Sequence, residues 1–209
     1  MGRGKKIDDV TVVIEAATAM IDERGIEEFS TRRLAAVLRI SAMTLYNYFA
    51  DRRAILKSVA IRCLEGFNLS IEREIESSTE VGADGNPMRL FKIIARRLLA
   101  LSVERPRLYL FLFESSVDGI RDDPEVLAEY HRFVEKVAAA IPDPDRAAEL
   151  RGDVLLFEML ANSHAIASVR WPRTISDKQC LVYIDRAYDR ILACYERDVV
   201  GAAVVARSA

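Results

Sequence analysis

The chain is poor in glycine, proline, cysteine and histidine, and each shortage excludes a class of structure. Its 209 residues include nine Gly, six Pro, three Cys and two His. So few Gly and Pro argue against a β-sandwich or barrel, which needs a turn about every ten residues. The three Cys are far apart and the His are isolated, so no metal-ligand spacing occurs. We therefore expect buried apolar thiols in a reducing compartment, with no metal and no cofactor.

A strong net charge and a long hydrophobic run are also missing. The net charge is -2 and the isoelectric point about 5.8, so a uniformly basic nucleic-acid coat is excluded and any such surface must be a local patch. No apolar run approaches the roughly 20 residues that cross a bilayer, and no targeting segment is visible. With 51% hydrophobic residues the chain has enough apolar side chains to bury a core. We expect a soluble cytoplasmic protein without a membrane partner.

Helical periodicity is present along most of the chain. Apolar residues recur at steps of three and four, which places them on one face of a helix. Pro87, Pro124 and Pro144 each follow Asn or Asp, a pattern typical of a capping residue before the first helical position. We predict an all-α fold of about nine helices. The apolar stripes fall in residues 7–21, 55–67, 90–101, 127–141 and 181–195.

Residues 25–57 predict a helix-turn-helix. Ser30 or Thr31 can cap a short helix that ends at Leu38, and Ser41 can cap a second one over residues 42–48. Asp51 can cap a third helix packed behind them. Two short helices joined by a tight turn have this geometry. The expected buried anchors are Leu34, Ala35, Val37, Leu38, Leu45 and Phe49.

The positive charge of the chain gathers on the same segment. Residues 30–57 hold six basic side chains and one acid, whereas residues 7–29 hold seven acids and one Arg. Such a concentration is typical of a surface that contacts phosphate. Arg52 stands in the first turn of its helix, where the dipole disfavours a cation unless an anion binds there too. On charge alone, a solvated mosaic of charges remains an alternative.

The second short helix carries candidate contacts to DNA. Thr44, Tyr46 and Tyr48 have hydroxyls of the kind that bond phosphate oxygens, although core packing is the alternative for both tyrosines. Asn47 suits adenine or a phosphate. Two further candidates, for thymine methyl groups, are Ala42 and Met43.

The run from Gly25 to Leu56 resembles the DNA-binding domain of the TetR (tetracycline repressor) family. The resemblance covers about the first sixty residues and rests on Gly25, on the segment Thr31–Ala35 and on Leu45-Tyr46-x-Tyr48-Phe49. It implies a DNA-binding domain over residues 1–58 and a helical domain for ligand binding and dimerisation over residues 59–209. Arg39 stands where the family often has Gly, and a turn with positive φ would cost a non-Gly residue up to about 1 kcal/mol.

The resemblance also implies roles for individual residues. Thr31 and Arg32 would contact DNA from the start of their helix, and Arg52, where the family usually has Lys, would contact a phosphate. The remaining implied positions on or beside the recognition helix are Ala42, Met43, Thr44, Tyr46 and Tyr48. The implied function is a homodimeric repressor that a small-molecule inducer releases from a palindromic operator in double-stranded DNA.

The C-terminal part predicts an interface between subunits. The last periodic helix has a second apolar stripe at Cys180, Tyr183, Ala187 and Cys194, and the segment from Val154 to Val169 is apolar on most faces. Apolar residues on two faces favour burial on two sides, so we expect a homodimer through the last two helices. A helix buried within a monomer is the alternative.

Polar and aromatic residues within the body are candidate ligand contacts. A pocket in such a body is mainly apolar with a few polar groups, and buried polar groups need partners. Core packing is the alternative for each. The candidates are Arg97, Tyr109, Phe113, Phe157, Asn162 and His164.

Two other classes of function compete with regulation. An enzyme is not expected, because the sequence has no phosphate loop, no nucleophile elbow and no set of metal ligands. A scaffold protein whose helix-turn-helix is purely structural would bind DNA without sequence preference. The concentrated basic patch weighs against that reading.

Overall fold

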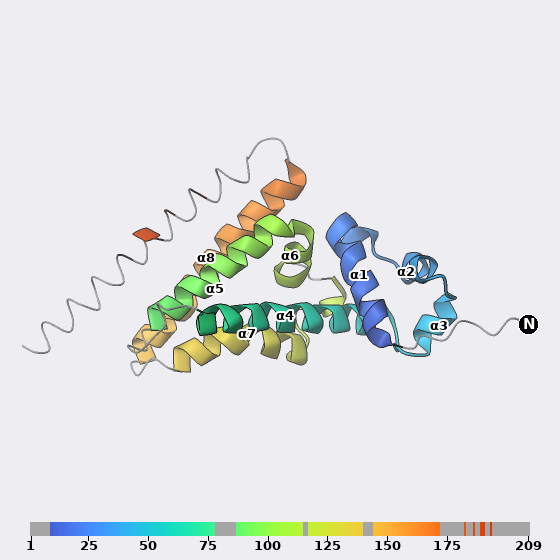
Figure 1. Ribbon diagram of the computed structural model, residues 1–209, viewed down its shortest axis with the longest axis horizontal. Helices are drawn as coiled ribbons and strands as arrows, with labels where there is room; N and C mark the ends of the chain where they lie inside the picture. The colour runs from blue at the N-terminus through green and yellow to red at the C-terminus, as the bar shows by residue number, and fades with distance from the viewer. Residues whose placement is uncertain are drawn as a thin grey trace, which may run out of the picture.

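The computed structural model describes residues 9–77, 87–114, 117–139 and 144–171, together with the single positions 182, 186, 189, 190 and 193. Within these ranges all regular structure is helical and no strand occurs, which confirms the predicted all-α class. The helices, shown in Figure 1, are α1 (Val10–Arg24), η1 (Ile26–Glu28), α2 (Thr31–Leu38), α3 (Ala42–Tyr46), α4 (Arg52–Ser77), α5 (Pro87–Glu104), α6 (Pro106–Phe113), η3 (Val117–Gly119), α7 (Pro124–Ala139) and α8 (Pro144–Arg170).

The helix starts follow the predicted caps. The side chain of Ser30 accepts a hydrogen bond from the N–H of Arg33 at 3.3 Å, and that of Ser41 accepts one from Thr44 at 3.1 Å. Asp51 does the same for Ala54 at 2.7 Å. Each bond satisfies a backbone donor that the helix itself leaves unpaired. The helices α5, α7 and α8 begin at the three prolines that the sequence predicts, and α6 begins at Pro106.

The helix-turn-helix is held together by a small apolar core. Leu34 of α2, Leu45 of α3 and Ile55 of α4 are fully buried against α1. Val37 was predicted to share this core, and that prediction is wrong, because its side chain is 62% exposed. At about 100° per residue the packed side of α2 is centred on Leu34, Ala35 and Leu38, and Val37 falls outside it.

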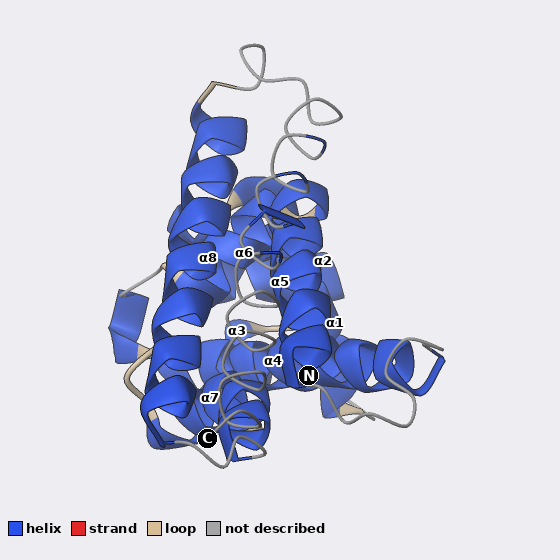
Figure 2. Ribbon diagram, turned by 90° about the vertical axis from the view of Figure 1, so that its left-hand side faces the viewer, coloured by secondary structure: helices blue, strands red, loops and turns tan. Residues whose placement is uncertain are grey.

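The body is built on the long helix α4. In Figure 1 the helices α2 and α3 lie at one end of the molecule, away from α5 and α8, which run side by side and pack on each other. Along its length α4 packs against α1, α5 and α7. Figure 2, coloured by secondary structure, shows helices and loops and no strand in the part of the chain that is described. The helix runs unbroken through residues 58 and 59, the boundary that the sequence predicts between the two domains.

Some predictions lie outside the described residues. These are the apolar stripes of the last helix, including Cys180, Tyr183, Ala187 and Cys194, and the side chain of Phe157. Among the helices that the structure describes, none combines the length and apolar character needed to span a membrane.

Candidate nucleic-acid interface

The helix α3 is anchored on one side and open on the other. Leu45 is fully buried and Phe49 nearly so, and both pack into the core beneath α3. Met43 is 71% exposed and Tyr46 44% exposed, and Asn47 is exposed beside them. A short helix with such apolar anchors presents its other side chains to a partner in solution. The structure thus places these three predicted DNA contacts on one outward face.

The start of α2 joins this face through a hydrogen bond. The hydroxyls of Thr31 and Tyr46 lie 3.2 Å apart, so the first residue of α2 and the last of α3 touch. Thr44 is held through its hydroxyl, 2.9 Å from that of the capping Ser41. The other predicted contacts on α3, Ala42 and Tyr48, are half-buried. Residues from both helices therefore form one continuous polar surface.

The turn between the two helices has a left-handed residue. Arg39 adopts φ 55° and ψ 43°, and the N–H of Ile40 donates to the carbonyl of Ala35 at 3.0 Å. This ends α2 in the manner usual for glycine, at a cost of up to about 1 kcal/mol for a residue with a Cβ. The side chains of Arg32 and Arg39 are exposed and make no ion pair within the described ranges. Both guanidinium groups are available to phosphate.

The basic start of α4 has a different environment. Arg52 forms an ion pair with Asp118, and its guanidinium lies 5.6 Å from the centre of the Phe29 ring. Arg53 donates to the Asp118 carbonyl and to the carboxylate of Asp123, both at 3.0 Å. Three of the six basic residues of the patch, Lys57 included, thus face the acids Asp118 of η3, Asp123 just before α7 and Glu125 of α7. A fourth, Arg33, pairs with Glu28 of η1 at 3.0 Å.

Lys57 completes this group of charged side chains. Its ammonium lies 3.0 Å from Asp123 and 2.7 Å from Glu125, and hydrogen bonds to Glu125 and Asp123 raise the pKa of Lys57. Burial alone would raise the pKa of Asp123, but hydrogen bonds from Lys57, from the Glu125 N–H and from Arg53 outweigh burial and lower it. We name residues 52, 53, 57, 118, 123 and 125 the junction cluster. Sequence reasoning missed its acids, although the run Asp122-Asp123-Pro124-Glu125 was a signal for them.

The predicted ligand contacts do not converge on one site. Tyr109 and Phe113 stack in the core with ring centres 4.6 Å apart, above a cavity of only about 20 Å³ that Phe113 lines. Asn162 donates to Glu114 at 3.1 Å on the surface of α8, and His164 is buried beside Ser168. A cavity of that size holds about one water molecule. These four residues therefore line no common ligand-sized space.

Arg97 lies elsewhere, and buried Glu158 has partners of its own. The guanidinium of Arg97 pairs with Glu74 at 2.6 Å and faces a groove between α1, α4 and α5. The carboxylate of Glu158 accepts a hydrogen bond from Tyr130 and pairs with Arg121 at 3.2 Å. Burial and the nearby Glu158 raise the pKa of Tyr130, so its hydroxyl stays protonated and donates. Glu158 is thus satisfied without a ligand.

The comparisons with known proteins agree with this geometry. Residues 13–59 match the family model of bacterial regulatory proteins of the tetR family. The HTH-type transcriptional repressor DrrR1 of Streptomyces coeruleorubidus is 32% identical over 94 residues, which cover 45% of this chain and 32% of the relative. The class D tetracycline repressor of Escherichia coli is 40% identical over 52 residues, covering 25% and 24% respectively. The chain thus matches about a third or less of the length of these relatives.

The fold likeness extends over the body. The regulator FadR of Bacillus subtilis, solved with stearoyl-CoA, superposes with a TM-score of 0.63 at 15% identity, covering 88% of this chain and 97% of that one. At that identity the likeness shows the fold alone. The family match thus covers the helix-turn-helix, residues 13–59, and the likeness of the body is one of fold. Across the described residues no group of His, Cys, Asp or Glu is arranged to hold a metal ion.

Proposed function

We propose that this protein is a homodimeric transcriptional repressor that binds a palindromic operator and is released by a small molecule. The observation that carries the proposal is the outward face of α3, where Met43, Tyr46 and Asn47 are exposed above the buried anchor Leu45. In a helix-turn-helix this is the face that enters the major groove. Residues 1–58 form the DNA-binding domain in this proposal and residues 59–209 the regulatory one.

The proposed contacts divide into two kinds. Hydroxyls and cations on the rim fix the register on the phosphates, and side chains in the middle of α3 reach base edges. Tyr46 and Thr31 act together, because their hydroxyls already lie within hydrogen-bond distance. The phosphate contacts are Thr31, Arg32, Thr44, Tyr46, Tyr48 and Arg52, and the base contacts are Ala42, Met43 and Asn47.

The apolar surface of α8 supports dimerisation. Leu155, Leu156, Met159 and Leu160 are between 40% and 58% exposed on consecutive turns, and Val182 of the following segment is 50% exposed. Exposed apolar side chains that cluster in this way mark an interaction surface. We assign the surface to a second copy of the chain, which makes an interface through the last two helices. Two recognition helices would then lie about 34 Å apart, one DNA turn.

The primary test is selection of DNA fragments by the purified full-length protein, followed by affinity titrations at several salt concentrations. We expect one enriched two-fold-symmetric site, bound with affinity that falls steeply as salt rises. Tyr46→Ala should weaken binding to that site about tenfold or more while the protein stays folded. Tyr46→Phe keeps the ring and removes only the hydroxyl that we assign to phosphate, so its loss of affinity measures the share of the hydroxyl. Equal binding by a folded Tyr46→Ala variant would show that α3 is not the reading helix.

The dimer is tested by light scattering. The double variant Leu155→Glu, Met159→Glu should run as a monomer and lose high-affinity operator binding. The control is Leu69→Glu, which places a carboxylate on an exposed leucine of α4, away from α8. A dimer that persists in the double variant would move the interface away from α8.

A further inference from the structure

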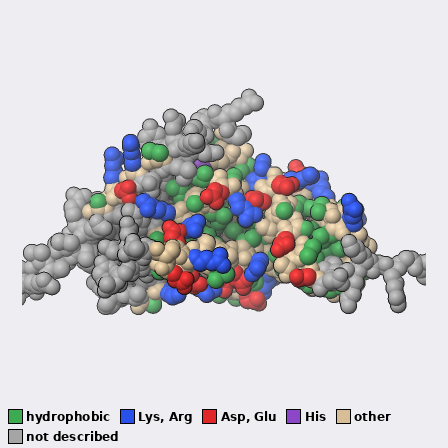
Figure 3. Space-filling model, in the orientation of Figure 1, with side chains coloured by type: hydrophobic (Ala, Val, Ile, Leu, Met, Phe, Trp, Pro, Cys, Tyr) green, Lys and Arg blue, Asp and Glu red, His purple; other side chains and the backbone are tan. Residues whose placement is uncertain are grey.

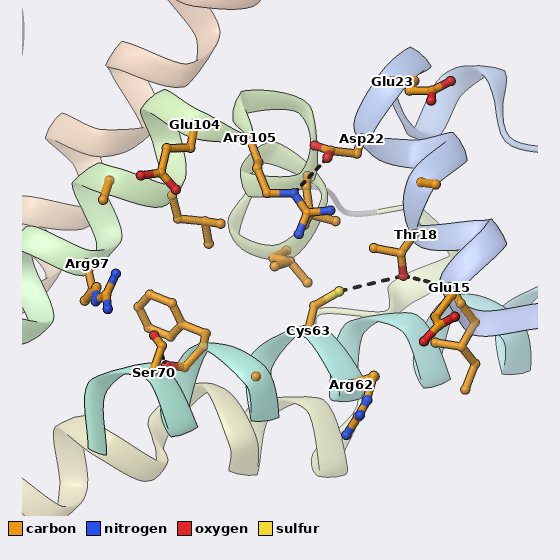
Figure 4. A pocket seen from close by; sticks show the side chains of 18 of the residues that line it. Glu15, Thr18, Asp22, Glu23, Arg62, Cys63, Ser70, Arg97, Glu104 and Arg105 are labelled. Carbon is orange, nitrogen blue, oxygen red and sulfur yellow. Dashed lines mark hydrogen bonds and ion pairs between the residues drawn. The ribbon is translucent and has the colours of Figure 1, made fainter. Parts of the chain in front are cut away.

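A groove lies between α1 and α5, beside α4. It has a volume of about 580 Å³ and lies between α1, α4 and the junction of α5 with α6 (Figure 4). Ligand sites of small molecules typically measure about 300–1,000 Å³. The groove is far larger than the cavity beside Phe113, and of the predicted ligand contacts it includes Arg97.

The floor of the groove is apolar. Cys63 and Phe67 of α4 line it together with Leu101 of α5 and Leu108 of α6, and Figure 3 shows apolar side chains among charged ones on this face. Gly66 lies in the middle of the α4 segment. A Cβ added there would meet no heavy atom within 4 Å, so the space above Gly66 is open.

Around the groove the arginines are paired with carboxylates, whereas several carboxylates have no cationic partner in the described part of the chain. Its three arginines each face a carboxylate: Arg97 faces Glu74 at 2.6 Å, Arg105 faces Asp22 at 2.7 Å and Arg62 faces Glu65 at 3.8 Å. The carboxylates left without a partner, among the residues that the structure describes, are those of Glu15, Glu23 and Glu104. The balance that a ligand meets is therefore negative.

We propose that the groove binds a lipophilic organic cation. The apolar part of the molecule lies on the floor above Gly66, where it removes apolar surface from water. The positive charge lies near Glu15 on α1 and Glu104 on α5, which stand at opposite walls of the groove in Figure 4. A cation beside a low-dielectric floor is attracted to these carboxylates more strongly than it would be in open water.

The location of the groove couples its occupant to DNA binding, and this step rests on the proposed function. Helix α1 belongs to the segment matched by the family model, and it is tied to the body by Arg105 to Asp22 and by Arg107 to the Glu23 carbonyl at 3.0 Å. A molecule between these elements favours one spacing of α1 from α5. Occupancy therefore shifts the protein toward a state that holds the helix-turn-helix differently and binds the operator less tightly.

The binding site is tested by calorimetry on the full chain with two probes of nearly equal shape, the tetraphenylphosphonium cation and the tetraphenylborate anion. We expect the cation to bind at least tenfold more tightly than the anion. Equal affinity, tighter binding of the anion, or no binding of the cation up to about 1 mM would overturn the proposal.

Variants assign the binding to the groove. Gly66→Leu fills the open space and should reduce phosphonium affinity at least tenfold, whereas Gly66→Ala adds one methyl group and should retain most of it. The double variant Glu15→Gln, Glu104→Gln should also lose at least tenfold, and Glu76→Gln, an exposed acid of α4 outside the groove, should lose nothing. Unchanged binding to a folded Gly66→Leu variant would place the cation elsewhere.

The regulatory step has its own readout. Phosphonium should weaken binding to the selected operator in the parent protein and leave it unchanged in Gly66→Leu. If phosphonium binds as expected and operator affinity does not change, the site stands and its regulatory role is overturned. If the protein binds no operator at all, the proposed function fails, while the calorimetric result on the groove still decides the binding site.

Discussion

Five of the six basic residues of the helix-turn-helix patch fall into two sets with different surroundings, and the sixth, Arg33, pairs with Glu28 of η1 at 3.0 Å. Arg32 and Arg39 project from α2 and the turn into solvent, without an ion pair in the part of the chain that the structure describes. The basic residues at the start of α4 are instead engaged by the carboxylates of the junction cluster. Residues of one basic patch therefore have two different roles. One set is free of ion pairs in the described residues, and the other ties the start of α4 to η3 and to the start of α7. Arg52, a proposed phosphate contact, would exchange Asp118 for the phosphate on binding DNA.

Removing the buried anchor of α3 should have the largest effect. Leu45 is fully buried, so Leu45→Ala should cost about 2–5 kcal/mol in the free energy of unfolding. Urea denaturation measures this loss, and operator binding should fall with it. Met43→Ala on the exposed side of α3 is the control and should change stability by no more than about 0.5 kcal/mol. Similar losses in both variants would contradict the assignment of the two sides of α3.

Removing charge from the first set should affect DNA and not the fold. Arg39→Gly keeps the left-handed turn, since glycine adopts φ 55° without strain, and it removes one cation. We expect the slope of log affinity against log salt to fall by about 1. Arg53→Ala should change this slope less, because Arg53 faces Asp118 and Asp123. Equal slopes for the two variants would contradict the division between the unpaired arginines and the paired basic residues at the start of α4.

Removing an acid that pairs with the basic residues of α4 should lower the stability of the fold slightly and strengthen non-specific DNA binding. Asp123→Asn removes the carboxylate shared by Arg53 and Lys57. The midpoint of thermal unfolding should fall by about 2–4 °C, the shift expected in a chain of this size for one lost charge-assisted bond. The salt dependence of DNA binding should steepen, because two cations are released. Asp122→Asn, an exposed neighbour, controls for the change in net charge.

The lowered pKa of Asp123 predicts a small effect of pH on the stability of the protein. The pKa of Asp123 is lowered in the folded protein, so its contribution to stability is present above the unfolded value of about 3.9. That contribution is lost as pH falls through the folded pKa. The difference in unfolding midpoint between the parent and Asp123→Asn should therefore be constant near neutral pH and shrink below about pH 4. A difference that grows in acid would mean that Asp123 is destabilised as a carboxylate.

Most of the local structure was predictable from the sequence. Ser30, Ser41 and Asp51 cap helices through bonds that span three residues, and such short-range contacts are visible in the sequence itself. The buried anchors Leu45 and Phe49 followed from helical periodicity. The prediction for Val37 was wrong, because periodicity does not determine how wide a face a short helix buries.

The candidate sites were predictable to different degrees. The outward position of Tyr46 and its neighbours follows from the spacing of the anchors on α3, so the sequence placed the candidate DNA face. The proposed contacts in the body came from residue type alone, and the structure scatters Tyr109, Asn162 and His164 over separate surroundings. Residue type says which chemistry a side chain has, but not which side chains it meets.

The sequence by itself determined the helices, their ends and the side of α3 that faces outward, because these depend on interactions within about four residues. Which acids engage Arg52 and Lys57 depends on the tertiary structure. Arg52 and its partner Asp118, for example, lie 66 positions apart in the chain. The tertiary structure also decided that α1 stands away from α5 and leaves a groove. Such contacts depend on how the helices pack, and packing is set by the summed burial of many side chains, which no local pattern encodes.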